Sequence, residues 1–259
     1  MSTPYASAAP YYARYRPPYP AELHALLADR FALDGSRTVL DLGAGPGTLS
    51  LPLAPLVEHV YAVDPEPAML AEGGRLAAES GRTNISWLRG DAAGIGRLCL
   101  PRIDLCVIGG AFHRMDRAQV PADLDGMLAP RGGIAVVTSL AEPWPAVVDE
   151  VRERFLGPDH GAARAAIEPG HEIQDLADRL AKSVFSRVEI TTWARSTRCT
   201  LDQLVGLEFS RACSPPALFG DRRDAFESEL RRALLDHDPG GTYTRTVTVA
   251  AAIATRPRR

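Results

Sequence analysis

The sequence predicts an α/β protein with a Rossmann-like, doubly wound sheet of seven strands and helical insertions. Near-continuous apolar runs alternate with helix-like patterns, which is typical of a parallel sheet covered on both faces. The first run, at 38–42, ends in an acid and a glycine-dense turn, the place where nucleoside ligands bind in such sheets. The predicted strands lie at 38–42, 59–63, 84–90, 103–108, 132–138, 186–193 and 242–254.

Helical patterns fill the segments between these strands. Leu23, Leu26, Leu27 and Phe31 have the spacing of an amphipathic helix, which we expect over 20–33. Glycine often ends a helix, so Gly81 is expected to close the helix that precedes it. The further predicted helices lie at 47–56, 66–80, 146–156, 172–183, 201–212 and 221–236.

Composition narrows the class of protein. The 259 residues are 46% hydrophobic and 24% charged, which is ordinary for a globular protein with a sizeable core. The formal net charge of −3 disfavours a nucleic-acid partner. No apolar run is long enough to span a membrane and no export signal precedes the first helix, so we expect a cytoplasmic protein with no membrane partner. The cysteines lack metal-ligand spacing, and Cys106 lies in an apolar strand, so reduced, structural thiols are expected.

The turn after the first strand indicates which kind of cofactor binds. Gly43, Gly45 and Gly47 alternate after Asp41. A dinucleotide fingerprint requires a third glycine where Thr48 stands, so a nicotinamide-dependent oxidoreductase is a distant alternative. The acid suits a cationic ligand better than a diphosphate. Pro46 is expected at the first position of the following helix, where its missing N–H costs nothing.

Two further acids stand at predicted strand ends. Asp64 follows the second strand 23 residues after Asp41, close to the offset of about 20 residues at which a carboxylate binds ribose hydroxyls. Asp91 follows the third strand. Each acid alone is equally well explained as a turn former or helix cap, but their common register with the glycine turn favours a cofactor site.

These residues resemble the class I S-adenosylmethionine-dependent methyltransferases, whose first motif is D-x-G-x-G-x-G. The segment 111–116, Ala-Phe-His-Arg-Met-Asp, resembles the A-x-H-W-x-D segment of bacterial small-molecule methyltransferases of the type 11-like group, with Arg114 in place of the usual Trp. The segment 12–20, Tyr-x-x-Tyr-Arg-Pro-x-Tyr-Pro, resembles their N-terminal flap, although the prolines of this region also suit a disordered, extended tail.

The resemblance implies S-adenosylmethionine as the cofactor. It implies that Asp91 accepts a hydrogen bond from the adenine amino group and that Ala92 donates its N–H. It also implies that Tyr15 or Arg16 contacts the methionyl carboxylate if the flap closes. The full set of implied cofactor residues is Tyr15, Arg16, Asp41, Gly43, Ala44, Gly45, Asp64, Pro65, Met69, Asp91, Ala92, Gly109 and Ala111.

The resemblance also implies an arrangement of the whole chain. A single methyltransferase domain spans 1–259, and its last strand inserts antiparallel between the fifth and sixth strands. We expect a flap at 1–20, a cofactor-binding core at 38–140, a helical lid at 141–184 and 200–238, and the final strands at 185–197 and 242–254.

His113 is the candidate catalytic residue, because its segment passes beside the methyl donor in that family. It would act as general base, or would only hold the loop by hydrogen bonds. Asp116 would orient His113 or cap the next helix. Tyr12, His113 and Trp144 are the candidate substrate contacts. The lid residues His160 and His171 are interpreted as polar loop residues, and no metal site is expected.

The predicted function is methylation of a small molecule at oxygen, nitrogen or carbon. Lys182 is the only lysine, a bias that suggests a GC-rich bacterial genome and hence secondary metabolism. A methyltransferase-like enzyme that catalyses a rearrangement or cyclisation and a non-catalytic S-adenosylmethionine-binding protein are the alternatives. A monomer and a homodimer are both compatible with the sequence.

Overall fold

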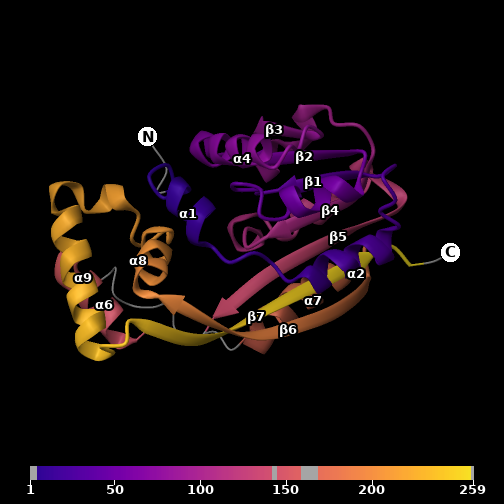
Figure 1. Ribbon diagram of the computed structural model, residues 1–259. Helices are drawn as coiled ribbons and strands as arrows, with labels where there is room; N and C mark the ends of the chain where they lie inside the picture. The colour runs from indigo at the N-terminus through magenta and orange to yellow at the C-terminus, as the bar shows by residue number, and fades with distance from the viewer. Residues whose placement is uncertain (1–4, 142–144, 159–168, 258–259) are drawn as a thin grey trace. The chain divides into compact units, whose positions relative to one another are not determined.

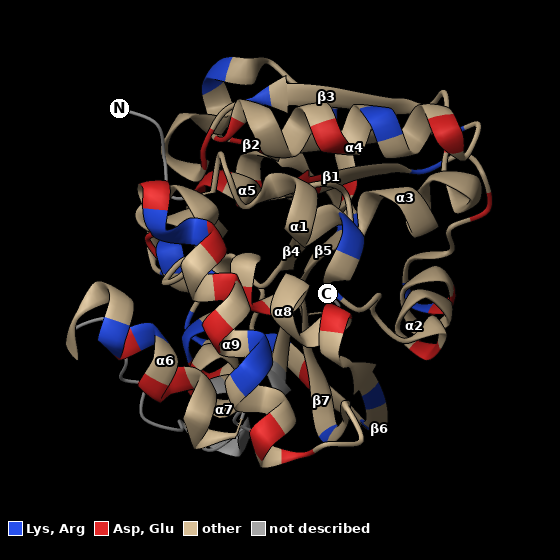
Figure 2. Cartoon of the chain, turned by 60° about the vertical axis from the view of Figure 1, so that its left-hand side comes forward, with Lys and Arg blue, Asp and Glu red and all other residues tan. Residues whose placement is uncertain are grey.

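The computed structural model describes residues 5–141, 145–158 and 169–257. The chain forms two compact units, each built from segments distant in sequence. The sheet unit comprises Pro18–Ser139, Pro169–Trp193 and Val249–Arg259. The helical unit comprises Met1–Pro17, Leu140–Glu168 and Ala194–Thr248. Figure 1 labels the strands and most of the helices of both units, and Figure 2 labels the remaining α-helices.

The sheet has seven strands in the order β3-β2-β1-β4-β5-β7-β6. The pairs β1–β2, β1–β4, β2–β3 and β4–β5 are parallel. β7 lies between β5 and β6 and runs opposite to both, which confirms the predicted place and direction of the last strand (Figure 1). The strands are β1 (Thr38–Leu42), β2 (His59–Asp64), β3 (Ile85–Arg89), β4 (Ile103–Gly109), β5 (Leu128–Ala141), β6 (Arg187–Thr200) and β7 (Thr242–Thr255).

Helices of the sheet unit pack on these strands. The helices are α2 (Ala21–Phe31), α3 (Ser50–Leu53), α4 (Pro67–Glu79), α5 (Gln119–Met127) and α7 (Pro169–Ala181). The short 3₁₀ helices are η1 (Ala54–Leu56), η2 (Ala92–Leu98) and η3 (Phe112–Arg114). Val120 and Leu124 of α5 join the same buried cluster as the strands. Cys106 of β4 is fully buried in that cluster, which confirms its packing role.

The predicted lid ran to residue 184, and this prediction is wrong for helix α7. Ile173, Leu176 and Leu180 repeat at helical spacing and are buried in the core cluster of the sheet. α7 therefore belongs to the sheet unit and covers the sheet. Its apolar face fits a sheet-covering helix as well as a lid helix, so the sequence pattern did not separate the two.

The start of the helix after β1 also differs from the prediction. The helix begins at Ser50, so Pro46 lies in the turn before it. Gly43, Gly45 and Gly47 have φ values of +77°, +55° and +84°, outside the right-handed helical region. Helical geometry therefore starts only after the last of these glycines.

The helical unit contains α1 (Ala9–Tyr15), α6 (Ala146–Leu156), α8 (Leu201–Phe209) and α9 (Arg223–His237), with the 3₁₀ turns η5 (Pro216–Leu218) and η6 (Gly220–Arg222). α1 replaces the extended tail that the prolines suggested. Its Tyr11 ring packs 5.1 Å from Phe209, and this burial stabilises a short helix that the sequence pattern missed.

A buried ion pair joins α6 to α8. Nε of Arg152 donates to Oε1 of Glu208 at 2.6 Å, and both side chains are fully buried. Ser214 also donates to Oε1 of Glu208 at 2.7 Å. Acidic and basic residues alternate along the exposed surface of α9 (Figure 2). No helix among the described residues is long and apolar enough to cross a membrane.

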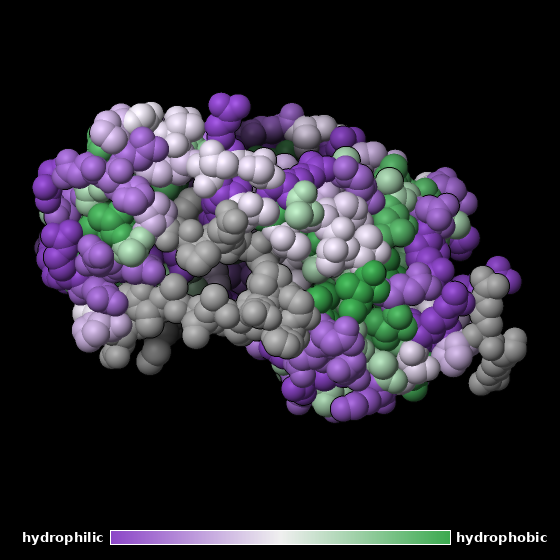
Figure 3. Space-filling view, turned by 90° about the horizontal axis from the view of Figure 1, so that it is seen from below, coloured by the Kyte–Doolittle hydropathy of each residue, from purple (hydrophilic) through white to green (hydrophobic). Residues whose placement is uncertain are grey.

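A few large apolar side chains stay at the surface. In the sheet unit, Val184 precedes the edge strand β6 and Ile190 lies in it, and both are exposed. Apolar surface on the face seen from below is green in Figure 3. Val184 and Ile190 therefore leave apolar side chains exposed at the β6 edge of the sheet.

Candidate active site

The turn between β1 and α3 forms one wall of the candidate site. A side chain at Gly43 would place its Cβ 2.6 Å from Cβ of Ala111, so glycine allows these two loops to touch. Nothing lies within 4 Å of the position that a Cβ would occupy at Gly45. The turn is thus closely packed at Gly43 and open at Gly45.

Asp64 lies at the end of β2 and is tied to this turn. Its Oδ2 accepts the N–H of Gly45 at 2.9 Å, and its Oδ1 accepts the N–H of Glu66 at 2.8 Å. Burial raises the pKa of Asp64, while these hydrogen bonds and the charge of Arg114 act in the opposite direction. Each carboxylate oxygen retains acceptor capacity for a further donor.

Asp41 lies at the end of β1 and is 1% exposed. Its Oδ2 accepts a hydrogen bond of 2.6 Å from the hydroxyl of Ser50. Burial raises the pKa of Asp41 to about 7, and the charge of Asp64 adds to the rise. A cation bound nearby would favour the ionised form of this carboxyl group.

The end of β4 supplies the opposite side. Gly110 has a φ of +60°. A side chain at Gly109 would meet the hydroxyl of Tyr19 at 3.0 Å, so Tyr19 lies directly on this strand end. Ala111 follows and contacts the turn after β1. The loops after β1 and β4 therefore meet at the carboxyl edge of the sheet, as parallel strands require.

His113 lies in η3, immediately after this loop, and is half-buried. Nε of Arg114 donates to Nε2 of His113 at 3.2 Å. Asp116 accepts the N–H groups of Ala118 and Gln119, both at 3.0 Å. The carboxylate of Asp116 thus supports the start of α5, in line with the capping interpretation.

Asp91 follows β3 and caps η2. Its Oδ1 accepts the N–H of Gly94 at 2.8 Å, and the side chain is exposed. This is the turn-forming role that a single acid can always have. Hydrogen bonding of Asp91 and Ala92 to an adenine stays a prediction. Met69, on α4, is buried, and Pro65 before it is exposed.

Several residues near the turn were missed by sequence reasoning. A Cβ at Gly47 would lie 2.5 Å from the ring of Trp87, and one at Gly73 would lie 2.3 Å from the same ring. Trp87 on β3 therefore packs against the glycine turn and α4. A glycine inside a predicted helix, such as Gly73, is a signal of such close packing. Ser50 and Tyr19 carried no comparable signal.

The implied contacts from the N-terminal segment lie in the helical unit. Nε of Arg16 donates to the hydroxyl of Ser210 at 2.9 Å, and its guanidinium lies 4.8 Å from the ring centre of Tyr12. The ring of Tyr15 packs on Gly206 of α8. Their contacts with cofactor or substrate stay predictions. Trp144 and His160 lie outside the described residues, and so does the side chain of His171.

Comparison with known proteins identifies the family. A family model described as a methyltransferase domain matches residues 39–132, from β1 into β5. Methyltransferase cfoB of Aspergillus candidus is 26% identical over 201 residues, which cover 76% of this chain and 58% of that protein. A putative type II methyltransferase of Anaeromyxobacter dehalogenans has a TM-score of 0.59 at 25% identity and covers 93% of this chain and 98% of its own. The chain belongs to the class I S-adenosylmethionine-dependent methyltransferases.

The fold of this chain is similar to that of a protein solved with S-adenosyl-L-homocysteine. An S-adenosylmethionine-dependent methyltransferase from Thiobacillus denitrificans, in complex with S-adenosyl-L-homocysteine, has a TM-score of 0.55 at 18% identity. The alignment covers 98% of this chain and all of that one, 100%. By contrast, the match to cfoB spans less than two thirds of the length of cfoB, 58%.

S-adenosylmethionine is the cofactor of this family, and the described residues fit it. The open space at Gly45 would let a ligand approach the backbone closely. Asp64 offers acceptor oxygens for ribose hydroxyls, and the acids suit a cationic sulfonium. Within the described part of the chain, no group of three or more His, Cys, Asp or Glu side chains is arranged to hold a metal ion.

Proposed function

We propose that this methyltransferase transfers the methyl group of S-adenosylmethionine to oxygen, nitrogen or carbon of a small molecule. The observation that carries the proposal is the Gly45–Asp64 hydrogen bond, which joins the glycine turn to the acid that would bind the ribose. The bound cofactor supplies an electrophilic methyl group on a sulfonium. The chain's own task is to align the acceptor, exclude water and remove a proton where the acceptor has one.

We propose His113 as the general base. Because an arginine only donates hydrogen bonds, the contact from Arg114 requires an unprotonated Nε2 on His113. Arg114 is exposed, so its side chain is able to turn away when an acceptor approaches. Nε2 would then take the acceptor's proton. In this scheme Arg114 is a positioning residue, because it acts through His113.

The net charge of the chain supports a small-molecule substrate over a nucleic acid. The chain carries a formal net charge of −3, which does not favour attraction to nucleic acid. We also propose a role in bacterial secondary metabolism, because the single lysine, Lys182, suggests a GC-rich bacterial genome. The chain would act in the cytoplasm, as a monomer or a homodimer.

The experiment uses methyl-labelled S-adenosylmethionine and a lysate of a bacterium with a GC-rich genome. The proposal predicts label in the small-molecule filtrate and much less of it with the His113→Gln variant. Label on the nucleic-acid or protein fraction would contradict a small-molecule substrate. Conversion of a lysate component that requires the cofactor but transfers no label would contradict methyl transfer and favour a rearrangement or cyclisation.

A further inference from the structure

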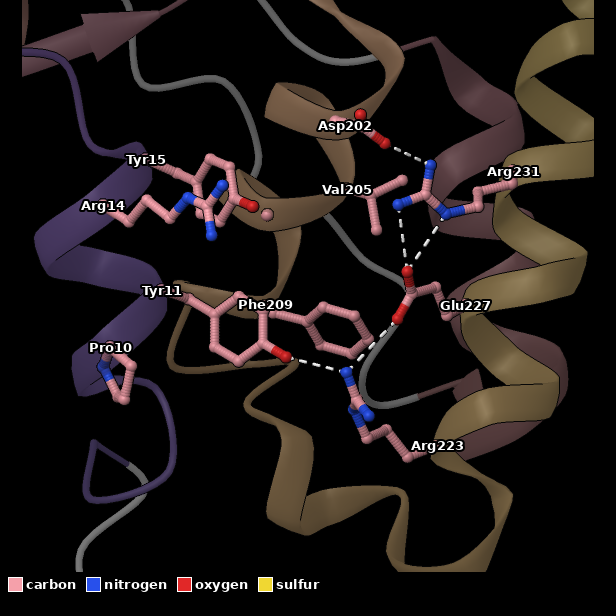
Figure 4. Close-up of a pocket in the computed structure, with 11 residues that line it drawn as sticks. Pro10, Tyr11, Arg14, Tyr15, Asp202, Val205, Phe209, Arg223, Glu227 and Arg231 are labelled. Atoms are coloured by element: carbon pink, nitrogen blue, oxygen red, sulfur yellow. Dashed lines mark hydrogen bonds and ion pairs between the residues drawn. The ribbon is translucent and has the colours of Figure 1, made fainter.

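The helical unit contains an open pocket of about 360 Å³. Its lining comes from α1, α8 and α9, all within this one unit (Figure 4). The volume lies at the lower end of the range for small-molecule sites, which is about 300–1,000 Å³. Apart from Tyr15, whose contact with the cofactor stays a prediction, no residue proposed to act at the glycine turn lines this pocket.

Aromatic rings form one side of the pocket. Tyr11 and Tyr15 on α1 are stacked with ring centres 6.2 Å apart, and Tyr11 lies 5.1 Å from Phe209 of α8. A Cβ at Gly206 would lie 2.3 Å from the ring of Tyr15. Gly206 therefore lets Tyr15 lie directly on the helix backbone. Such a wall favours a flat, apolar ligand.

The opposite side is charged, and its charges are mostly neutralised. Along α9, Arg223, Glu227 and Arg231 recur every four residues and so lie on one face. Arg223 donates to the hydroxyl of Tyr11 at 2.8 Å and pairs with Glu227 at 3.3 Å. Arg231 pairs with Glu227 and with Asp202, at 3.0 and 2.6 Å. Two acids thus balance these two arginines.

Arg14 adds a third positive charge to the lining. Its guanidinium lies 5.1 Å from the ring centre of Tyr15, and among the described residues it has no acidic partner. Figure 4 shows Arg14 on the α1 side, across from the ion pairs of α9. The pocket therefore has one cation in excess, next to its aromatic wall.

We propose that this pocket binds a small aromatic carboxylate. Its ring would pack against Tyr11 and Tyr15, which Phe209 supports from behind, and its carboxylate would pair with Arg14. Guanidinium groups bind carboxylates in a planar, two-pronged geometry, and stacking on Tyr15 already restrains the Arg14 group. The proposal stands independently of methyl transfer, because binding needs no cofactor.

The test compares two probes that differ only in charge, 2-naphthoate and the neutral 2-naphthamide. Their affinities are measured by calorimetric titration of the full chain without S-adenosylmethionine. We expect 2-naphthoate to bind at least about tenfold more tightly than the amide. Arg14→Gln should weaken 2-naphthoate binding by about tenfold and leave the amide unchanged, and Arg14→Lys should retain part of the preference.

Arg232→Gln is the matched control. Arg232 is an exposed arginine of α9 that pairs with Glu229 and does not line the pocket, so its removal should change neither affinity. Equal binding of acid and amide would overturn the proposal. So would an unchanged affinity of Arg14→Gln, or no binding of 2-naphthoate up to millimolar concentration.

Discussion

The main-chain N–H of Gly45 donates a hydrogen bond of 2.9 Å to Oδ2 of Asp64. This bond connects the turn after β1 to the end of β2, two strands that pair in parallel. It fixes the carboxylate beside a stretch of backbone that has open space above it. A ligand in that space would meet bare backbone and an acceptor group at once.

Gly45→Ala tests whether this open space belongs to the cofactor. The left-handed φ of +55° makes the alanine strained by about 1–2 kcal/mol, but its Cβ meets no protein atom within 4 Å. We expect a folded variant whose affinity for S-adenosylmethionine is at least about tenfold lower. Calorimetric titration measures the affinity, and urea unfolding measures the stability.

Gly35→Ala is the matched control for that variant. Gly35 has a φ of +92°, and a Cβ there also meets nothing within 4 Å. It should show a similar loss of stability with unchanged cofactor affinity. Equal affinities of the two variants would contradict the assignment of the Gly45 space to the cofactor.

The pH dependence of the free energy of unfolding should reveal the raised pKa of Asp41. Its pKa rises from the ordinary 3.8 to about 7 in the folded protein, so folding binds a proton between these pH values. This contribution is complete below pH 3.8, falls as pH rises, and is lost above about pH 7. It amounts to roughly 4 kcal/mol at most.

Asp41→Asn removes that proton linkage and keeps an acceptor for Ser50. Urea unfolding at pH 5 and pH 8 should show that the wild-type protein loses more stability with rising pH than the variant does. The free energies of unfolding give the comparison directly. Parallel pH profiles for the two proteins would show that Asp41 titrates normally.

His113→Gln tests the general base. We expect the rate of methyl transfer to fall by about 10²–10⁴-fold, while affinity for S-adenosylmethionine stays unchanged. His237→Gln, at the exposed end of α9, is the control and should keep the wild-type rate. A rate within a few fold of wild type for His113→Gln would assign this histidine to loop support.

The buried pair of the helical unit should be sensitive to removal of one partner. Arg152→Met leaves the buried Glu208 without its closest cation and with only the partly exposed Arg211, 3.2 Å away, so we expect a loss of about 3 kcal/mol in the free energy of unfolding. The double variant Arg152→Met with Glu208→Leu should recover most of this loss. If the double variant is no more stable than the single one, an uncompensated charge is not the cause.

Local patterns predicted much of the sheet and of the turn. β1 spans Thr38–Leu42 as expected, because apolar residues of a parallel strand form an unbroken run that ends at a polar turn. Asp64 and Gly45 were both expected in the site, and they are hydrogen-bonded. Motifs at strand ends are predictable because parallel strands bring those ends to one edge.

Residues whose role depends on tertiary packing were less predictable. The helix α1 was missed because its stability comes from Tyr11 packing on Phe209, nearly 200 residues away in the chain. α7 was predicted to lie in a lid, because the apolar face of a helix does not indicate which surface the helix covers. Ser50 was missed because a serine in a helix gives no sign of the buried acid that it contacts.

Calorimetric titration with S-adenosylmethionine measures whether the turn at Gly45 and the acid Asp64 bind this cofactor. We expect one binding site per chain, with affinity at least about tenfold lower in Asp64→Asn. Asp178→Asn, an exposed acid of α7, should bind as the wild type does. No binding to the wild-type protein, or equal affinities of wild type and Asp64→Asn, would contradict binding of the cofactor at Gly45 and Asp64.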